Sequence, residues 1–299
     1  MPTPVIIEAA INGVTGPERN PSVPRSPAEI AADAARCLAA GAAIVHSHNA
    51  EFVLEGARAA ELYLAAWRPV LRERPDAILY PTAGAGATIA ERYAHEVLLA
   101  EAGALRMGLV DPGSVNLGGA DEHGLPLPSD FVYVNSHSDI LYEVGLCERY
   151  RLGPSISIFE PGFLRVALAF HRARRLPPGA LVKLYFGGDE AYLGGSGVTF
   201  GLPPTAPSLA AYLAMLEGCE LPWSVAVLGG DVIASGLARL ALERGGHLRV
   251  GLEDYAGPRR PTNEELVREA AALVRATGRR VATCAEAASI LGLPREEAS

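Results

Sequence analysis

The segment Ile44-Val45-His46-Ser47-His48 is predicted to end a buried strand, because an apolar run follows the helix-ending Gly41 and leads into two histidines. Side chains alternate between the two faces of a strand, so His46 and His48 point to the same side. Two imidazoles about 7 Å apart along a strand can share one metal ion. The alternative is that one histidine belongs to the core and the other to a loop. The choice between a metal site and two structural histidines depends on the rest of the sequence.

Apolar runs that favour strands alternate with helical segments along the whole chain. A helix begins at Ser26-Pro27-Ala28-Glu29, which combines a cap, a proline at the first position and a glutamate at the third. The predicted strands are residues 4–10, 44–48, 77–80, 104–110, 155–159, 181–186, 223–227 and 247–252. The predicted helices are residues 26–40, 54–73, 89–102, 138–150, 163–175, 208–217, 229–244, 263–277 and 284–291. A short strand-like run at 131–134 is placed outside the main sheet.

Strict alternation of strand and helix means a parallel sheet, either doubly wound or closed into a barrel. About eight units in 299 residues favour the (β/α)8 barrel. The turn Asn12-Gly13-Val14-Thr15-Gly16 is not the glycine-rich fingerprint of dinucleotide-binding folds, which lowers the doubly wound alternative. We therefore expect one barrel domain over residues 1–299, with a short C-terminal helical extension.

Composition excludes several classes of function. The net charge of −8, without a basic stripe, argues against nucleic acid as a partner. There is no uncharged apolar run of about 18 residues to span a membrane and no signal-peptide pattern. The four cysteines are far apart and form no CxxC pair, which is typical of free thiols in a reducing cytosol. A cytoplasmic protein without disulfides is expected.

Polar residues follow the predicted strands, where a barrel enzyme carries its catalytic groups. Any one of them alone could be a helix cap or a surface turn, but their recurrence after successive apolar strands argues against accident. The residues concerned are His46, His48, Thr82, Asp111, Ser114, Glu160, Glu253 and Asp254.

Two histidines and a carboxylate, with a coordination position left open, are the ligands of catalytic zinc. The strands that carry His46 and Glu253 flank the first strand of the barrel, so their ends can meet over its mouth. The same ligands suit ferrous iron, so the ligand types leave the metal open. The other five histidines are interpreted as structural.

Arg249 lies four residues before Glu253, on the same face of the last strand. A cation inside a barrel needs an anion, which Asp254 or Glu160 could supply. The alternative is a purely structural ion pair. Glu8, inside the first apolar strand, either faces the pocket or is a bonded carboxylate of the barrel floor.

Over nearly its whole length the chain resembles the β-keto acid cleavage enzymes, the family of 3-keto-5-aminohexanoate cleavage enzyme. The resemblance rests on the order and spacing of several short motifs. These are Asn12-Gly13, His46-x-His48, Thr82-Ala83-Gly84, Asp111-Pro112-Gly113-Ser114-Val115-Asn116, Phe159-Glu160-Pro161-Gly162, Gly201-Leu202-Pro203-Pro204-Thr205 and Gly246-His247-Leu248-Arg249-Val250-Gly251-Leu252-Glu253-Asp254.

This resemblance implies a zinc-dependent (β/α)8 enzyme, usually a homo-oligomer, that converts a β-keto acid and acetyl-CoA into acetoacetate and a new acyl-CoA. It implies His46, His48 and Glu253 as metal ligands. Arg249 and Asp254 match a charged pair tied to proton transfer, with Asp254 the candidate base. Glu160 matches a pocket carboxylate. The matching loops offer the candidate substrate-binding residues Thr15, Thr82, Gly84, Ser114 and Asn116.

Two stretches depart from the family pattern. After His48 the family usually has an arginine and an Asp-Gly pair, where this chain has Asn49-Ala50-Glu51-Phe52. Gly229-Gly230-Asp231 lacks the basic residue that the family often has there, in a place suited to CoA phosphate. With Glu8, Glu51, Glu160 and Asp231 near the mouth, an acidic pocket is expected, which favours a neutral or cationic substrate tail.

Two other functions fit parts of the pattern. Metal-dependent hydrolases of the amidohydrolase kind are also barrels with an HxH motif. They require further histidines at the C-terminal ends of strands, where this sequence has none of its remaining histidines. A barrel that binds a metal or ligand without catalysis is the other. Activity with acetyl-CoA separates the first interpretation from both.

Overall fold

A computed structural model describes residues 3–190, 192 and 195–294, and its eight strands form one parallel sheet in the order β3-β2-β1-β8-β7-β6-β5-β4. The strands are β1 (Ile7–Ala10), β2 (Ile44–Ser47), β3 (Ile78–Pro81), β4 (Met107–Val110), β5 (Gly153–Ile158), β6 (Leu181–Gly187), β7 (Trp223–Leu228) and β8 (His247–Val250). Since β3 and β4 also approach each other, the sheet is a nearly closed barrel. The predicted (β/α)8 fold is confirmed.

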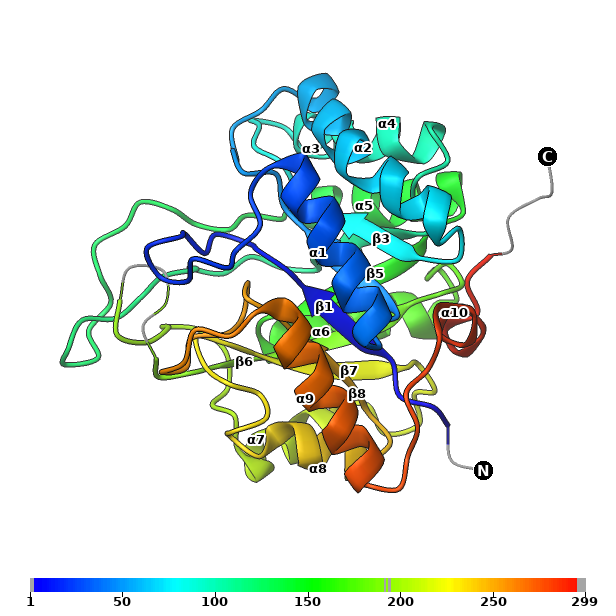
Figure 1. Ribbon diagram of the computed structural model, residues 1–299. Coiled ribbons are helices and arrows are strands. Elements are labelled where there is room, and N and C mark those ends of the chain that lie inside the picture. Colours follow the sequence, from blue (N-terminus) through cyan, green and yellow to red (C-terminus); the bar gives the residue numbers. More distant parts are fainter. Residues whose placement is uncertain (1–2, 191, 193–194, 295–299) are drawn as a thin grey trace.

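Helices follow the strands and surround them (Figure 1). They are α1 (Pro27–Ala40), α2 (Gly56–Glu73), α3 (Ile89–Arg92), α4 (Ala94–Glu101), α5 (His137–Tyr150), α6 (Pro161–Arg172), α7 (Ala206–Met215), α8 (Leu237–Glu243), α9 (Asn263–Ala276) and α10 (Cys284–Leu291). Ser26 caps α1 in a box with Glu29, as its sequence indicates. Among the described residues, no helix combines the length and apolar character needed to cross a bilayer.

Two predicted helices are wrong in extent. The helix at 89–102 is divided at Tyr93, because the Arg92 carbonyl accepts a hydrogen bond from the Gly84 amide instead of continuing the helical ladder. The helix predicted to open at Gly229-Gly230-Asp231 begins only at Leu237. The Asp231 carboxylate accepts from the amides of Ile233 and Ala234, which folds residues 231–236 into turns.

The loops after β4 and β6 carry little regular structure. Tyr133 forms one bridge with Val115, so the run at 131–134 lies outside the main sheet, as expected. The glycine-rich loop at 187–204 is described except for residues 191, 193 and 194. These loops extend from one end of the barrel, and α10 lies at the opposite end (Figure 1).

Alternation along the strands divides the apolar residues between two layers. Ile7, Val45 and Val182 belong to the layer between barrel and helices. Their neighbours on the other face belong to a cluster at the barrel floor, which includes Ile6, Ile44, Ile78, Leu181 and, from α10, Ala287 and Leu291. The short C-terminal helix thus packs under the barrel, away from the ends of the strands where function is expected.

His247 at the start of β8 is buried, and its Nδ1 accepts a hydrogen bond from the Ile6 amide at 3.1 Å. Burial lowers the pKa of His247 to about 4. The unfolded chain binds this proton near pH 6.5 and the folded chain does not, so stability is lost as pH falls below about 6.5.

We expect His247→Asn, which keeps an acceptor for the Ile6 amide, to lose less stability than wild type on acidification. Between pH 6 and 5 the difference in the loss of unfolding free energy should reach about 1 kcal/mol. Urea titrations at several pH values measure it, with the exposed His123→Asn as control. Equal pH slopes for His247→Asn and wild type would contradict this account.

Candidate metal centre and active site

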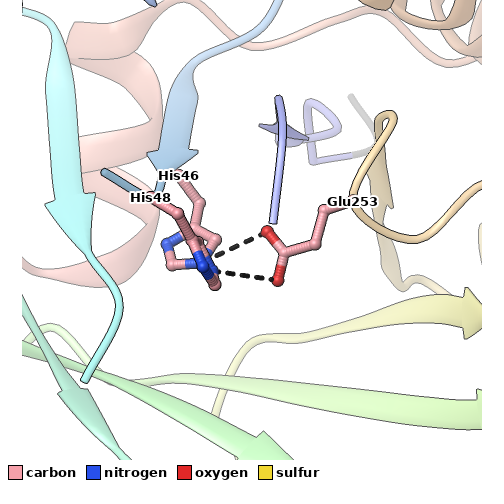
Figure 2. A group of neighbouring side chains, drawn as sticks. All are labelled: His46, His48 and Glu253. Atoms are coloured by element: carbon pink, nitrogen blue, oxygen red, sulfur yellow. Dashed lines mark hydrogen bonds and ion pairs between the residues drawn. The ribbon is translucent and has the colours of Figure 1, made fainter. Parts of the chain in front are cut away.

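Three side chains converge at the carboxyl end of the barrel: His46 on β2, His48 just after it, and Glu253 after β8 (Figure 2). The Nε2 atoms of the two histidines are 3.2 Å apart. His46 Nε2 lies 3.3 Å from Glu253 Oε2, and His48 Nε2 lies 3.4 Å from Glu253 Oε1. Of the described residues, these form the group of three whose donor atoms could hold one ion.

The donor set fits a divalent metal. Tetrahedral zinc, with bonds of about 2.0–2.1 Å, places its ligand atoms about 3.3 Å apart, which matches these three separations. Glu253 Oε2 is buried and has no hydrogen-bond donor. The Nε2 atoms of the two imidazoles face each other, and a hydrogen bond between them needs one to donate and the other to accept. An ion would satisfy all of these atoms at once.

Surrounding groups hold the two histidines in place. The Nδ1 atom of His46 lies 3.3 Å from the Tyr80 carbonyl, which leaves Nε2 free as a ligand, and the Tyr80 ring stacks on the imidazole. The Asn12 amide bonds the backbone of His48 on both sides, accepting from its N–H at 2.8 Å and donating to its carbonyl at 2.9 Å. The Asn12-Gly13 motif therefore orients the second histidine.

Gly13 makes room for Glu253. Its backbone has φ of 55°, in the left-handed region, and a Cβ there would lie 2.2 Å from Glu253 Cγ. The Glu253 amide donates to the Ala10 carbonyl at 3.1 Å, which ties the loop after β8 to the end of β1. A side chain at position 13 would thus displace the carboxylate ligand.

Arg249 on β8 is buried inside the barrel and bonds three carboxylates. Its Nε and Nη2 donate to Asp254 at 2.8 and 3.0 Å, its Nη1 donates to Glu8 at 2.7 Å, and Nη2 lies 3.0 Å from Glu253 Oε1. Glu8 also accepts from the Tyr80 hydroxyl, and it is a bonded carboxylate inside the barrel. Asp254, one of the two expected partners of Arg249, is its partner in the structure.

The charges in this network set one another's protonation. Burial raises the pKa of Glu253, but Arg249 and the two histidines outweigh it and hold that pKa well below its usual range. Burial raises the pKa of Asp254 to about 6, against the opposing charge of Arg249. Burial lowers the pKa of Lys183 on β6, whose Nζ donates to the Tyr80 hydroxyl at 3.0 Å. Glu253 is therefore ionised, as a ligand must be.

A cavity of about 280 Å³ opens over His46, His48 and Glu253. Most of its lining comes from the strand ends and from the loops that follow them. The remaining lining residues are Val14, Phe52, Thr82, Leu109, Asp111, Leu117, Phe131, Tyr133, Ser157, Phe159, Lys183, Tyr185, Tyr192, Phe200 and Leu228.

Of the five predicted substrate-binding residues, Thr82 lines this cavity. Gly84 lines a smaller neighbouring cavity that also touches His48. The Thr15 hydroxyl instead donates to the Leu252 carbonyl at 2.6 Å, so it supports the loop that carries Glu253. Ser114 is hydrogen-bonded to the backbone of Asn135, and Asn116 is exposed and does not line the cavity.

Glu160, predicted as a pocket carboxylate, does not line the cavity over the ligands. It accepts a hydrogen bond from the Gly201 amide at 2.9 Å and lines a separate cavity with Ser114. It follows β5 as the N-cap residue of α6, with extended backbone. Arg249 and Asp254 also do not line the large cavity. Arg249 contacts Glu253, which does line it, and Asp254 is bonded to Arg249.

The sequence reasoning missed Lys183, which lines the cavity and is 1% exposed. A signal was present, since Lys183 is the one charged residue in the otherwise apolar strand 181–186. Alternation places it opposite to Val182 and Leu184, hence inside the barrel. Asp111, noted only as a strand-end carboxylate, also lines the cavity and accepts from the Tyr133 hydroxyl.

Fold and site together define a (β/α)8 barrel with a candidate metal centre at the carboxyl ends of its strands. Residues 4–293 match the family model of the beta-keto acid cleavage enzymes. The chain belongs to this family, as its motifs indicated.

Curated relatives of known name cover nearly the whole chain. The 3-keto-5-aminohexanoate cleavage enzymes of Acetoanaerobium sticklandii and Fusobacterium nucleatum are 27% and 29% identical over 97% of this chain, and the matches span 99% and 98% of those proteins. The 3-oxoadipate:acetyl-CoA acetyltransferase of Cupriavidus necator is 28% identical over 99% of this chain and 98% of its own length.

Among solved structures, ObcA in a ternary complex with a C4-CoA adduct and oxalate matches with a TM-score of 0.66. The match covers 91% of this chain and 68% of ObcA at 19% identity. Likeness at this level of identity supports the fold.

We expect Gly13→Ala to weaken metal binding about 10- to 100-fold, because the new methyl group displaces Glu253. Titration of chelator-treated protein with zinc, followed by calorimetry, measures the Kd. Gly124→Ala is the matched control, since Gly124 has φ of 81° but nothing within 4 Å of a built Cβ. If Gly13→Ala binds zinc with wild-type affinity, the absence of a side chain at position 13 is not required for Glu253 to bind the metal.

Proposed function

We propose that this protein transfers the acyl part of a β-keto acid to CoA, converting the keto acid and acetyl-CoA into acetoacetate and a new acyl-CoA. The observation that carries the proposal is the convergence of His46, His48 and Glu253 beneath the cavity of a barrel of this family. The name of the Cupriavidus necator relative supports acetyl-CoA as the co-substrate.

We propose zinc as the ion held by His46, His48 and Glu253. The ligand types and the separations of their donor atoms support it, although ferrous iron takes the same ligands. When bound, a divalent ion supplies positive charge beside the keto oxygen and carboxylate of the substrate, which favours loss of a proton from C2.

The bonds change in two stages. C2 loses a proton, attacks the acetyl carbonyl of acetyl-CoA and expels the CoA thiolate. The thiolate then attacks the original keto carbon, the C2–C3 bond breaks, and the proton returns to C2. The acetyl group now sits on C2 as acetoacetate, and the rest of the keto acid leaves as a thioester of CoA.

Two buried carboxyl groups could accept the proton from C2. Asp254 is the acceptor that the family resemblance implies, and it is held by both Arg249 nitrogens next to the ligand Glu253. Asp111 is the second candidate, because it lines the cavity and its Oδ1 has no hydrogen-bond partner. Lys183 lines the same cavity and can pair with the substrate carboxylate.

The decisive experiment incubates zinc-loaded protein with β-keto acids and acetyl-CoA and identifies acyl-CoA products by mass. Formation of acetoacetate together with the matching acyl-CoA is the expected result. Hydrolysis of a substrate without acetyl-CoA would favour the hydrolase interpretation, and absence of turnover across the panel would favour a binding protein.

We expect Asp254→Asn to retain zinc and to lose about 10²–10⁴-fold in kcat, which is the contribution of a general base. Metal content and kcat at saturating zinc are the measurements, with Asp111→Asn measured in parallel. Recovery of activity by excess zinc would mean that Asp254 acts through Arg249 on the ligand Glu253. A large loss in Asp111→Asn alone would assign the base to Asp111.

A cytoplasmic location and a homo-oligomer remain proposals. The four cysteines are unpaired, three of them buried, which supports a reducing compartment. Light scattering of the purified protein measures the oligomer.

A further inference from the structure

The cavity over His46, His48 and Glu253 has a charged floor and an apolar wall. Its charged residues besides the three ligands are Asp111 and Lys183, which lie at the end of β4 and inside β6. The wall comes from loops and strand ends farther out. It consists of Val14, Phe52, Leu117, Phe131, Tyr133, Phe159, Tyr192, Phe200 and Leu228.

Several aromatic rings of the cavity lining pack around Phe159. Phe159 stacks on Tyr185 at 4.8 Å between ring centres and meets Phe200 and Tyr133 edge-on, both at 6.1 Å. Phe131 and Phe52 are both 53% exposed at the rim. Large apolar side chains left open at the edge of a cavity favour an apolar ligand.

Each charged group on the floor has a hydrogen-bond partner within the protein, and one oxygen, Asp111 Oδ1, has none. Asp111 accepts from the Tyr133 hydroxyl, and Lys183 donates to the Tyr80 hydroxyl and faces the ionised Glu8. Burial raises the pKa of Asp111, which favours its neutral form. The floor therefore has room for the one carboxylate that every β-keto acid carries, beside Lys183 and the ligand cluster.

The structure places the four carboxylates of the expected acidic pocket outside this cavity. Glu8 is paired with Arg249 below the cavity, and Glu160 and Asp231 line other cavities. Glu51 is exposed and lines the smaller neighbouring cavity that also touches His48. None of these four carboxylates lines the cavity over the ligands.

We infer that the substrate is a β-keto acid whose tail is uncharged and apolar. This inference rests on the proposed function and specifies its substrate class. An ammonium or a second carboxylate on the tail would lose its hydration against the wall, which carries no charged side chain to pair with it. The substrates that name the relatives, 3-keto-5-aminohexanoate and 3-oxoadipate, both carry such a charge.

Three six-carbon acids test the tail alone: 3-oxohexanoate, 3-keto-5-aminohexanoate and 3-oxoadipate, with neutral, cationic and anionic tails. With acetyl-CoA and zinc-loaded protein, kcat/KM for 3-oxohexanoate should exceed both others by about 100-fold or more. Lengthening the neutral tail by one methylene, to 3-oxoheptanoate, should raise kcat/KM about fourfold.

Leu117→Arg tests the wall directly by placing a cation in it. We expect this variant to raise kcat/KM for 3-oxoadipate relative to 3-oxohexanoate at least tenfold. Leu125→Arg is the matched control, because Leu125 lies on the same loop, is 62% exposed and does not line the cavity. Phe131→Arg, at the exposed rim, makes the same test should Leu117→Arg fail to fold.

The outcomes separate the inference from the function beneath it. Turnover of 3-oxohexanoate with both charged acids poor supports both. Equal or faster turnover of a charged acid overturns the inference and leaves the cleavage function standing. If the protein prefers 3-keto-5-aminohexanoate and Asp111→Asn abolishes that preference, Asp111 is the residue that binds the ammonium group of the tail. No turnover of any keto acid would instead reject the cleavage function, and with it the inference.

Discussion

The ion pairs of Arg249 are the interaction on which the site depends. A guanidinium inside a barrel has lost its water, and its burial is tolerable only because carboxylates surround it. Arg249 and Glu8 face each other in the register of β8 and β1, and Asp254 and Glu253 follow on the same chain. One cation therefore joins two strands and holds the carboxylate ligand on which the candidate metal centre relies.

Backbone conformation matters as much as charge. The loop after β8 can turn back toward β1 because Gly251 has φ of 143° and passes so close to Ala10 that a Cβ would lie 2.0 Å from its carbonyl oxygen. Gly13 leaves space on the other side of Glu253. Gly251 thus lets the loop approach β1 and Gly13 leaves room for the Glu253 side chain, which is a physical reason for the glycines in these motifs.

Much of this was predictable from local chemistry. The HxH strand, the capping box at Ser26 and the strand that precedes Glu253 are short-range patterns whose geometry follows from period two or from one helical turn. The sequence could not show that Glu160 lines a separate cavity, because its position after β5 does not decide which cavity its side chain enters. Lys183 was missed because only polar residues at the ends of strands were considered as candidates, and Lys183 lies in the middle of a strand.

The sequence by itself determined the family, the parallel barrel and the three metal-binding candidates, because strand alternation and ligand spacing are local properties that repeat along the chain. Only the tertiary structure decided which polar groups meet. It paired Glu8 with Arg249, placed Lys183 and Asp111 at the cavity floor, and built the wall from loops distant in sequence. The character of that wall, and hence the substrate tail, depends on which loop side chains pack together, and no local pattern encodes those contacts.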